Sequence, residues 1–225
     1  MRTAAVKEDH ASKIQQVFQK FQKVNPQPDY LPVEKIYTTP FMSLVGVVLS
    51  AQTRDEKTAE ACERLFAVAT TPEEILALDD EMLRSLIHPV GMYNTKTKNL
   101  KIMSQQLLDR HNGQVPAARE ELLALTGVGR KSTDIMMRFV FQQPAIAVDT
   151  HVHRLANRLG MAATKTEEQT ANVLDRHTPD EFRWLAHEWM VEFGKHVCRA
   201  RNPLCDSCMF TDICDYYQGS MARRT

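Results

Sequence analysis

The sequence of 225 residues lacks an apolar run long enough to cross a membrane. Its longest near-apolar run, Phe41 to Leu49, has nine residues including a serine and a glycine, whereas a spanning helix needs about 20. The first residues, MRTAAVKEDHASK, carry acidic side chains and no apolar core, which excludes a secretory signal peptide. We therefore expect no membrane segment, and a location in the cytoplasm or, in a nucleated cell, the nucleus.

The sequence also lacks net charge, because 28 basic residues are balanced by 28 acidic ones. A strongly basic chain would indicate nucleic-acid binding, so this balance at first argues against it. Only eight glycines and ten prolines are present, and no stretch has the composition of a flexible linker. Composition alone therefore shows no domain boundary, although the 43% hydrophobic fraction is enough for a globular core.

The alternation typical of a half-buried strand is missing, while helical spacing recurs almost everywhere, as in the apolar stripe from Phe182 to Phe193. Thr71-Pro72-Glu73-Glu74 and Thr178-Pro179-Asp180-Glu181 both have the form of a capping box with proline at the first helical position. Thr166 with Gln169 is a looser copy. We predict an all-α fold, with helices after Thr166 and Thr178 and near residues 10–23, 38–51, 55–68, 72–87, 94–111, 116–124, 131–141 and 150–158.

Four of the five cysteines fall within 17 residues near the C-terminus, in the pattern C-x6-C-x2-C-x5-C. Disulfides are not expected in a reducing compartment. Four thiolates can surround one centre, and thiolates select zinc or iron–sulfur clusters. Only the central pair has the close spacing of a zinc knuckle, which favours an iron–sulfur cluster over zinc, with four buried free cysteines as the other alternative. The four candidate ligands are Cys198, Cys205, Cys208 and Cys214.

A glycine-rich turn, Leu125-Thr126-Gly127-Val128-Gly129-Arg130-Lys131, separates two predicted helices. Its two glycines permit a hairpin whose N–H groups bind a phosphate oxygen without reading a base, although a plain turn between helices is the alternative. Lys131 falls in the first turn of the next helix, where the helix dipole and neighbouring Arg130 both disfavour the ammonium form. A lysine with a lowered pKa can form a Schiff base, and a solvated surface lysine is the alternative.

A carboxylate, Asp149, stands between a short apolar run and a predicted helix. Asp149 suits a helix N-cap, and the N–H donors of a helix start would also keep it ionised, as a catalytic anion must be. His151 and His153 are candidate metal ligands or phosphate contacts, with a histidine of the core or of a helix cap as the alternative.

In this order, the motifs LTGVGRKS, AVDTHVHRLANR and C-x6-C-x2-C-x5-C resemble the endonuclease III group of helix-hairpin-helix DNA glycosylases. LSAQTRD from Leu49 and GMYNTKTKNL from Gly91 extend the likeness, which runs from about residue 30 to about residue 217. The resemblance implies two all-helical lobes with a DNA cleft between them. One lobe would be a six-helix barrel over 33–143, with the helix-hairpin-helix at about 116–141. The other would comprise 1–32 and 144–225 and hold a [4Fe-4S] cluster on the loop 198–214.

The resemblance implies a bifunctional DNA glycosylase and AP lyase of base excision repair, which removes oxidised pyrimidines of the thymine glycol type and cleaves the abasic site by β-elimination. Lys131 would form a Schiff base at C1′, and Asp149 would be the assisting carboxylate. Because the target base must leave the stack, Gln52 and Met92 are implied as the residues that enter the duplex. The other implied DNA contacts are Gly127, Val128, Gly129, Arg130, His151, Arg199 and Arg201.

Three positions depart from the family's pattern. Met92 stands where leucine is more usual, and Asn202 and Leu204 stand where relatives are often basic. The contribution of the loop between Cys198 and Cys205 to DNA affinity is therefore open. The implied [4Fe-4S] cluster would be structural, since none of its four ligand positions is left for a substrate.

Two other functions fit parts of the pattern. An adenine-specific mismatch glycosylase has a small residue or tyrosine at the position of Lys131, and a C-terminal recognition domain for which no residues follow Thr225. A non-catalytic iron–sulfur DNA-binding protein would use the hairpin only as a clamp. The partner implied by the resemblance is double-stranded DNA with an oxidised pyrimidine or abasic site, bound by a monomer of the bacterial cytoplasm, associated with the nucleoid and not with a membrane.

The charges are distributed unevenly, which qualifies the zero net charge. Residues 94–160, which contain the hairpin, Lys131 and Asp149, hold ten basic and five acidic residues, whereas acidic residues dominate 55–93 and 161–193. DNA affinity follows the phosphates neutralised at the contact face and not the total charge. A neutral chain is therefore compatible with DNA binding, and we predict a polarised surface.

Overall fold

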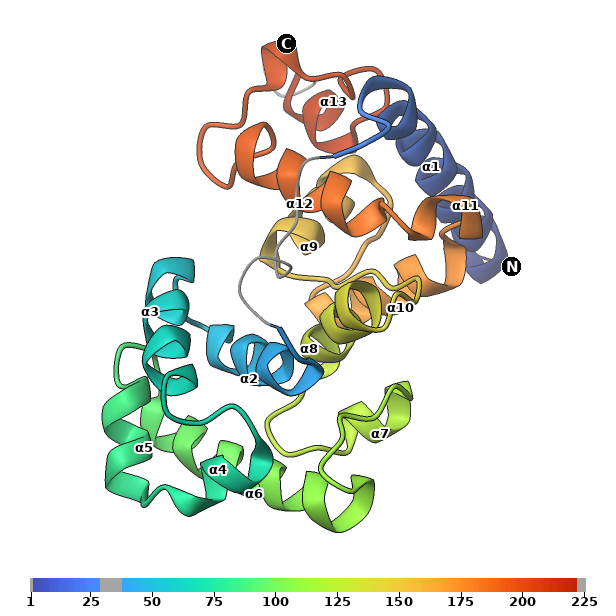
Figure 1. Ribbon diagram of the computed structural model, residues 1–225. Coiled ribbons are helices and arrows are strands. Elements are labelled where there is room, and N and C mark those ends of the chain that lie inside the picture. The colour runs from blue at the N-terminus through green and yellow to red at the C-terminus, as the bar shows by residue number, and fades with distance from the viewer. Residues whose placement is uncertain (1, 29–37, 222–225) are drawn as a thin grey trace. The chain divides into compact units, whose positions relative to one another are not determined.

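The computed structural model describes residues 2–28 and 38–221, and no β-strand occurs in these two ranges, which confirms the all-α class. None of the helices described is long and apolar enough to cross a membrane. The chain divides into two compact units (Figure 1). We call Met1–Leu31 with Pro144–Thr225 the terminal unit, and Pro32–Gln143 the central unit. The lobe boundary expected at residues 32 and 33 lies outside the described residues.

The central unit is built around α2 (Pro40–Ser50), whose residues 41–49 are all buried. Thr39 caps this helix, since its hydroxyl accepts the Met42 N–H at 3.2 Å. The elements that pack against α2 are α3 (Asp55–Phe66), α6 (Tyr93–His111), α8 (Arg130–Ile135) and the π-helical turn η1 (Met136–Val140). The other helices of the unit are α4 (Pro72–Ala77), α5 (Asp80–Ile87) and α7 (Arg119–Leu123). The most apolar segment of the chain is therefore the core of a helical unit.

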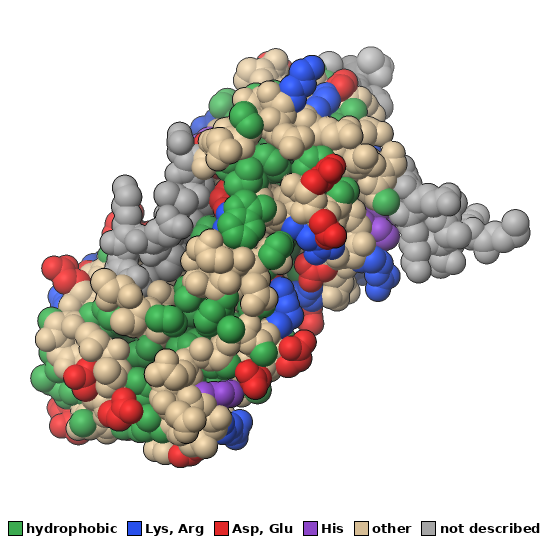
Figure 2. All heavy atoms as spheres, turned by 45° about the vertical axis from the view of Figure 1, so that its right-hand side comes forward, with side chains coloured by type: hydrophobic (Ala, Val, Ile, Leu, Met, Phe, Trp, Pro, Cys, Tyr) green, Lys and Arg blue, Asp and Glu red, His purple; other side chains and the backbone are tan. Residues whose placement is uncertain are grey.

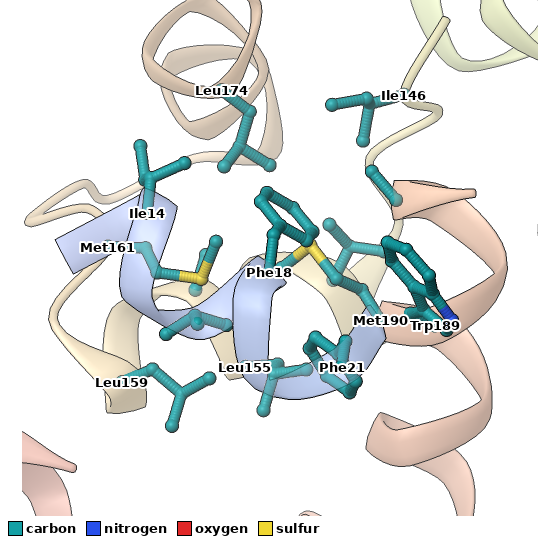
Figure 3. Packing of buried hydrophobic residues seen from close by; sticks show 14 of the residues in the cluster. Ile14, Phe18, Phe21, Ile146, Leu155, Leu159, Met161, Leu174, Trp189 and Met190 are labelled. Carbon is teal, nitrogen blue, oxygen red and sulfur yellow. The ribbon is translucent and has the colours of Figure 1, made fainter. Parts of the chain in front are cut away.

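The terminal unit combines the first helix of the chain with its C-terminal part. Its elements are α1 (Arg2–Val24), α9 (Thr150–Leu159), α10 (Glu167–His177), α11 (Asp180–Arg183), α12 (Ala186–His196), the 3-10 helix η2 (Cys205–Ser207) and α13 (Asp215–Met221). Figure 3 shows Phe18 and Phe21 of α1 close to Trp189 and Met190 of α12. The rings of Phe21 and Trp189 stack at 6.0 Å between centroids.

The same aromatic core extends beneath the cysteine-rich segment. The Phe210 ring lies 4.9 Å from that of Phe21 and 5.1 Å from that of Phe193, in edge-on geometry, and its side chain is fully buried. Phe210 stands between Cys208 and Cys214 in the sequence. Burial of this ring against α1 and α12 therefore anchors the segment between those two cysteines.

Two helices that the sequence predicts as continuous are interrupted. Residues 72–87 form α4 and α5, because Leu78 is extended (φ −68°, ψ 141°) and the Asp79 carboxylate accepts the Met82 N–H at 2.7 Å to start the second helix. The apolar stripe from 182 to 193 is divided between α11 and α12. Apolar spacing continues across both interruptions, which is why the pattern does not show them.

Two further predicted helices differ in length or type. The helix expected at 116–124 spans only Arg119–Leu123. The helix expected at 131–141 changes to π geometry at Met136, where the Phe141 N–H donates to the Met136 carbonyl at 3.0 Å. Such a turn adds one residue between bonded groups and shifts the faces that follow it.

The predicted caps have different outcomes. The capping box at Thr71 is confirmed: its hydroxyl accepts the Glu74 N–H at 3.3 Å, and the Glu74 carboxylate accepts the Thr71 N–H at 3.2 Å. Thr166 also caps its helix, by accepting the Gln169 N–H. The capping box at Thr178 is wrong, because the Thr178 N–H donates to Leu174 at the end of α10. The buried Thr178 hydroxyl has no hydrogen-bond partner among the described residues.

The two threonines should respond oppositely to substitution. Thr71→Ala removes a working cap and should lower the free energy of unfolding by about 1 kcal/mol. Thr178→Val replaces a buried hydroxyl without a partner by a methyl group of similar shape, so it should leave that free energy unchanged or raise it by up to about 1 kcal/mol. Urea denaturation followed by circular dichroism measures both. A loss for Thr178→Val as large as that for Thr71→Ala would contradict the assignment of an unbonded hydroxyl.

Candidate functional site

The glycine turn of the central unit connects α7 to α8. Gly127 has φ +84°, and a Cβ there would lie 3.1 Å from the Asn99 side chain of α6, so both the conformation and the space require glycine. Gly129 is the N-cap of α8, with nothing within 4 Å of the position of a Cβ. The Thr126 N–H donates to Gln106 Oε1 at 2.8 Å. Asn99 and Gln106 of α6 thus fix the position of the turn against this helix.

The residues of this turn that are predicted to contact phosphate differ in whether their backbone N–H groups are available. Val128 is buried and its N–H already donates to the Leu125 carbonyl at 3.1 Å. Gly127 and Gly129 are exposed, and neither donates its N–H to an acceptor in the described part of the chain. The amide donors available to a phosphate are therefore those of the two glycines, while Val128 anchors the turn in the core.

Lys131 is exposed in the first turn of α8, directly after this hairpin. Beside it, the Arg130 guanidinium lies 3.8 Å from the buried carboxylate of Asp134, which also bonds Arg119 of α7. This ion network joins α7 to α8 across the hairpin. It was not visible in the sequence, where Asp134 is one more polar residue of a helix.

The two residues expected to enter the duplex lie on neighbouring turns of the central unit. Gln52 follows α2 and Met92 precedes α6, and both are exposed in the left-handed conformation, with φ 52° and 54°. The Gly91 N–H donates to Thr53 Oγ1 at 3.2 Å, which joins the two turns directly. Non-glycine residues adopt positive φ uncommonly, and such conformations are enriched at functional and strained positions.

Asp149 begins α9 in the terminal unit, and the expectation that it is an N-cap is confirmed. Its Oδ1 accepts the His151 N–H at 2.8 Å and the Val152 N–H at 2.9 Å, while Oδ2 makes no hydrogen bond with any described residue. His153 bonds Thr170 at 2.7 Å and thereby joins α9 to α10. One carboxylate oxygen is thus used by the fold and the other remains available.

Two arginines one turn apart on α9 connect this helix to the cysteine segment. Arg154 donates to the Gly194 carbonyl at 2.6 Å and the Cys198 carbonyl at 3.0 Å, and its Nη2 lies 3.3 Å from His151 Nδ1. Burial lowers the pKa of Arg154, and the Cys198 thiolate opposes this shift. The sequence shows these arginines in the motif AVDTHVHRLANR, and only their spacing of four residues hinted that they share a face.

The second arginine supports the loop between the first two cysteines. Arg158 donates to the Arg199 carbonyl at 2.8 Å and the Ala200 carbonyl at 3.1 Å, and its guanidinium lies 4.6 Å from the centre of the Tyr216 ring. In the loop, Arg199 and Arg201 are exposed, and Asn202 has φ 49°. Asparagine adopts this conformation more readily than lysine or arginine, so Asn202 suits this turn.

All four cysteines of the motif line one pocket of the terminal unit. Cys198 follows α12, Cys205 is the first residue of η2, Cys208 follows η2, and Cys214 precedes α13. Arg158 contacts two of them, because its Nη1 lies 3.5 Å from the Cys198 sulfur and its carbonyl accepts from the Cys214 thiol at 3.3 Å. The fold therefore collects all four thiols around one space.

The electrostatics of this pocket favour a positively charged occupant. Burial raises the pKa of the Cys208 and Cys214 thiols, and repulsion from the other thiolates adds to the effect. Four thiolates can be ionised together only where a cation compensates their charge. Among the described residues no three potential ligands are grouped closely enough to hold one metal ion. Four thiol donors that line one pocket are the ligand type of both zinc and iron–sulfur centres.

The charged side chains do not form one area of a single sign on the face that Figure 2 shows, where basic and acidic groups are interspersed with apolar ones. This agrees with the zero net charge of the chain. The polarised surface expected from the sequence stays a prediction. The predicted site residues belong to both units: the hairpin, Lys131, Gln52 and Met92 to the central unit, and Asp149, His151 and the cysteines to the terminal unit.

The chain matches known proteins over most of its length. Residues 45–179 match the family described as HhH-GPD superfamily base excision DNA repair protein. Endonuclease III of Thermotoga maritima is 42% identical over 192 residues, 84% of this chain and 90% of that protein. Endonuclease III of Haemophilus influenzae is 39% identical over 201 residues, 89% of this chain and 94% of that protein.

A solved structure with a similar fold is a trapped covalent intermediate of endonuclease III with DNA. It has a TM-score of 0.85 and 33% identity, and the match covers 94% of this chain and 98% of that one. These matches and the all-helical fold confirm the resemblance carried by the motifs. The chain belongs to the endonuclease III family, the DNA glycosylases and AP lyases of base excision repair within the HhH-GPD superfamily.

Proposed function

We propose that the chain removes oxidised pyrimidines from double-stranded DNA and cleaves the resulting abasic site through a Schiff base at Lys131. The observation that carries this proposal is the exposed Lys131 directly after a turn whose two glycine N–H groups are available to a phosphate. A phosphate bound there would place the DNA backbone beside the amine. The covalent endonuclease III–DNA intermediate supports the same route, because a covalent bond to DNA requires a nucleophile in the protein.

The reaction proposed for Lys131 has two stages. The neutral amine attacks C1′ of the damaged nucleotide, the base leaves with the electrons of the glycosidic bond and accepts a proton, and the opened sugar forms an imine with Lys131. The imine acidifies the C2′ hydrogens, so loss of one of these protons expels the 3′-phosphate by β-elimination. Water then releases Lys131 from the cleaved product. Neither stage consumes an oxidant or a reductant.

Asp149 is proposed as the carboxylate of this reaction. Its Oδ1 is held by two backbone N–H groups, so the side chain has a fixed direction, while Oδ2 remains available. A fixed anion can stabilise the positive charge that develops on the sugar and can carry protons between steps.

Damaged DNA is proposed to be held open by Gln52 and Met92. Both side chains are exposed at the tips of left-handed turns, as expected of groups that enter the space left by a displaced base. The exposed Arg199 and Arg201, with Arg130 and His151, are the further side chains proposed to meet the DNA. We expect a monomer acting on chromosomal DNA in the bacterial cytoplasm.

The cysteine pocket is proposed to hold a [4Fe-4S] cluster with a structural role. Cys198, Cys205, Cys208 and Cys214 would be its ligands, because all four line the pocket and thiolates select such a centre. When bound, the cluster would supply positive charge that compensates the four thiolates. The arginines of α9 and the Phe210 ring hold the segments that carry the ligands.

Borohydride reduction tests the Schiff base. Wild-type protein incubated with duplex DNA containing an abasic site or thymine glycol should give a covalent adduct, and Lys131→Ala should give none, because an imine forms only with the amine of this lysine. Denaturing gel electrophoresis measures the adduct.

Asp149→Asn should keep the helix cap but lower the rate of base removal by about 100-fold or more, because an amide cannot replace the charge of the carboxylate.

Three results would reject this assignment. An adduct undiminished in Lys131→Ala would place the nucleophile elsewhere. Wild-type protein that binds damaged DNA but neither traps nor cleaves it would show the non-catalytic DNA-binding protein instead. Adenine release from mismatched DNA, with no action on thymine glycol, would indicate the mismatch glycosylase.

Metal analysis tests the cysteine site. Anaerobically purified protein should contain about four iron and four sulfide per chain and no stoichiometric zinc. Cys205→Ser should lose most of this iron and lower the melting temperature, because the centre would lose one of its four ligands and metal binding contributes to folding free energy. Cys62→Ser is the matched control, since Cys62 lies in the central unit and should leave the iron content unchanged. Stoichiometric zinc without sulfide would overturn the cluster assignment.

A further inference from the structure

A lysine that the proposed mechanism does not use is buried beneath the two turns of Gln52 and Met92. Lys96 lies in the second turn of α6 and is only 4% exposed. Lysine is almost never buried to this extent unless its charge is bonded. Burial lowers the pKa of Lys96 to about 8. Its position therefore costs stability, which indicates a specific role for its hydrogen bonds.

The Lys96 ammonium donates to three acceptors, all from the segment that carries Gln52. Nζ lies 2.8 Å from the Leu49 carbonyl, 2.7 Å from the Ala51 carbonyl and 3.0 Å from Thr53 Oγ1. An ammonium group has three N–H donors, so all of them are used. The acceptors stand on both sides of Gln52 in the sequence, and their bonds hold the end of α2 and the turn that follows it.

The backbone of the same lysine holds the other turn. The Lys96 N–H donates to the Met92 carbonyl at 3.0 Å and closes the first turn of α6. Lys96 is thus bonded to both left-handed turns, to one through its side chain and to the other through its main chain.

The contact between the two turns is completed by Thr53 and Gly91. Thr53 Oγ1 accepts from Lys96 Nζ and from the Gly91 N–H, and it donates to the Ala51 carbonyl at 3.2 Å. A Cβ on Gly91 would lie 3.0 Å from the Gln52 carbonyl, which is too close for an undistorted structure. The two turns are therefore in direct contact, and Lys96, Thr53 and Gly91 form one network between them.

We propose that Lys96 is a positioning residue that holds the turns of Gln52 and Met92 in one arrangement, so that both side chains enter the duplex together when the target base leaves the stack. This inference rests on the proposed function. Left-handed conformations of non-glycine residues are unfavourable by themselves, so the two tips need such support to be present before DNA binds. Support that exists in advance removes the need to order the turns during base displacement.

The proposal predicts a selective defect in Lys96→Met, which keeps the apolar stem and removes the donors. Removal of thymine glycol from duplex DNA should fall about 10- to 100-fold, mainly in kcat, because the turns act after the first encounter with DNA. Borohydride trapping at a preformed abasic site, where no damaged base must be displaced, should change less than about 3-fold. Thr53→Ala and Gly91→Ala should have the same selectivity.

The matched control is Lys101→Met on the same helix. Lys101 Nζ also donates to two backbone carbonyls, those of Leu76 and Leu78, but these lie at the end of α4 and not at the two turns. Because Lys101→Met loses similar bonds elsewhere on α6, it should lower the melting temperature. It should not reduce base removal more than borohydride trapping. Fluorescence of 2-aminopurine placed beside the lesion adds a direct signal, which should rise on binding of wild-type protein and of Lys101→Met, and not of Lys96→Met.

Several results would overturn the proposal. Normal base removal and fluorescence in Lys96→Met would show that the network is not needed for insertion. Equal losses in base removal and trapping, matched by Lys101→Met, would show a general effect on stability. Failure of the proposed function itself has a different signature, because wild-type protein would then give no adduct that depends on Lys131.

Discussion

Every helix leaves backbone N–H groups unbonded at its start and carbonyls unbonded at its end, and a chain made only of helices contains many such ends. In this chain, long basic side chains donate hydrogen bonds to many of the carbonyls at helix ends and in the segments that follow. Lys96 and Lys101 of α6 bond carbonyls at the ends of α2 and α4, and Arg154 and Arg158 of α9 bond carbonyls at the end of α12 and in the loop after it. Lys20 of α1 bonds the Met209 carbonyl and the Asp212 carboxylate. Because charged donors make stronger hydrogen bonds than neutral ones, these side chains determine where the connecting segments lie.

The proposed functional groups stand on the segments held in this way. In the central unit, α6 contacts two of them: Lys96 supports the turn of Gln52, and Asn99 and Gln106 hold the glycine turn, at Gly127 and at the Thr126 N–H. In the terminal unit, α9 begins at Asp149 and continues to the arginines that hold the cysteine loop. One rigid helix in each unit thus sets the positions of residues that are distant in the sequence. Proposed groups on loops gain the precision of a helix by bonding to it.

The sequence was sufficient to predict the caps and the core helix that depend only on adjacent residues. The cap at Asp149, the capping box at Thr71 and the apolar core helix α2 each follow from a few adjacent residues, and the structure contains all three. Thr178 has nearly the same motif as Thr71 but fails as a cap, because its N–H is already used to end α10. That outcome depends on the preceding helix and not on the motif. Lys96 was missed for a similar reason: a lysine in a helix is normally solvated, and only the tertiary fold brings three acceptors to its amine.

These internal bonds also change what the charge distribution means for DNA binding. Of the ten basic residues between 94 and 160, six are bonded or paired to groups of the protein itself: Lys96, Lys101, Arg119, Arg130, Arg154 and Arg158. Arg138 is buried as well. Most of these side chains are therefore held by contacts within the fold, although bonds to neutral carbonyls leave their positive charge in place. Contacts through backbone N–H groups carry little net charge and release few counterions. We therefore expect the N–H groups of Gly127 and Gly129 to add contacts to the DNA backbone that depend weakly on salt, with Lys131 as an exposed amine beside them.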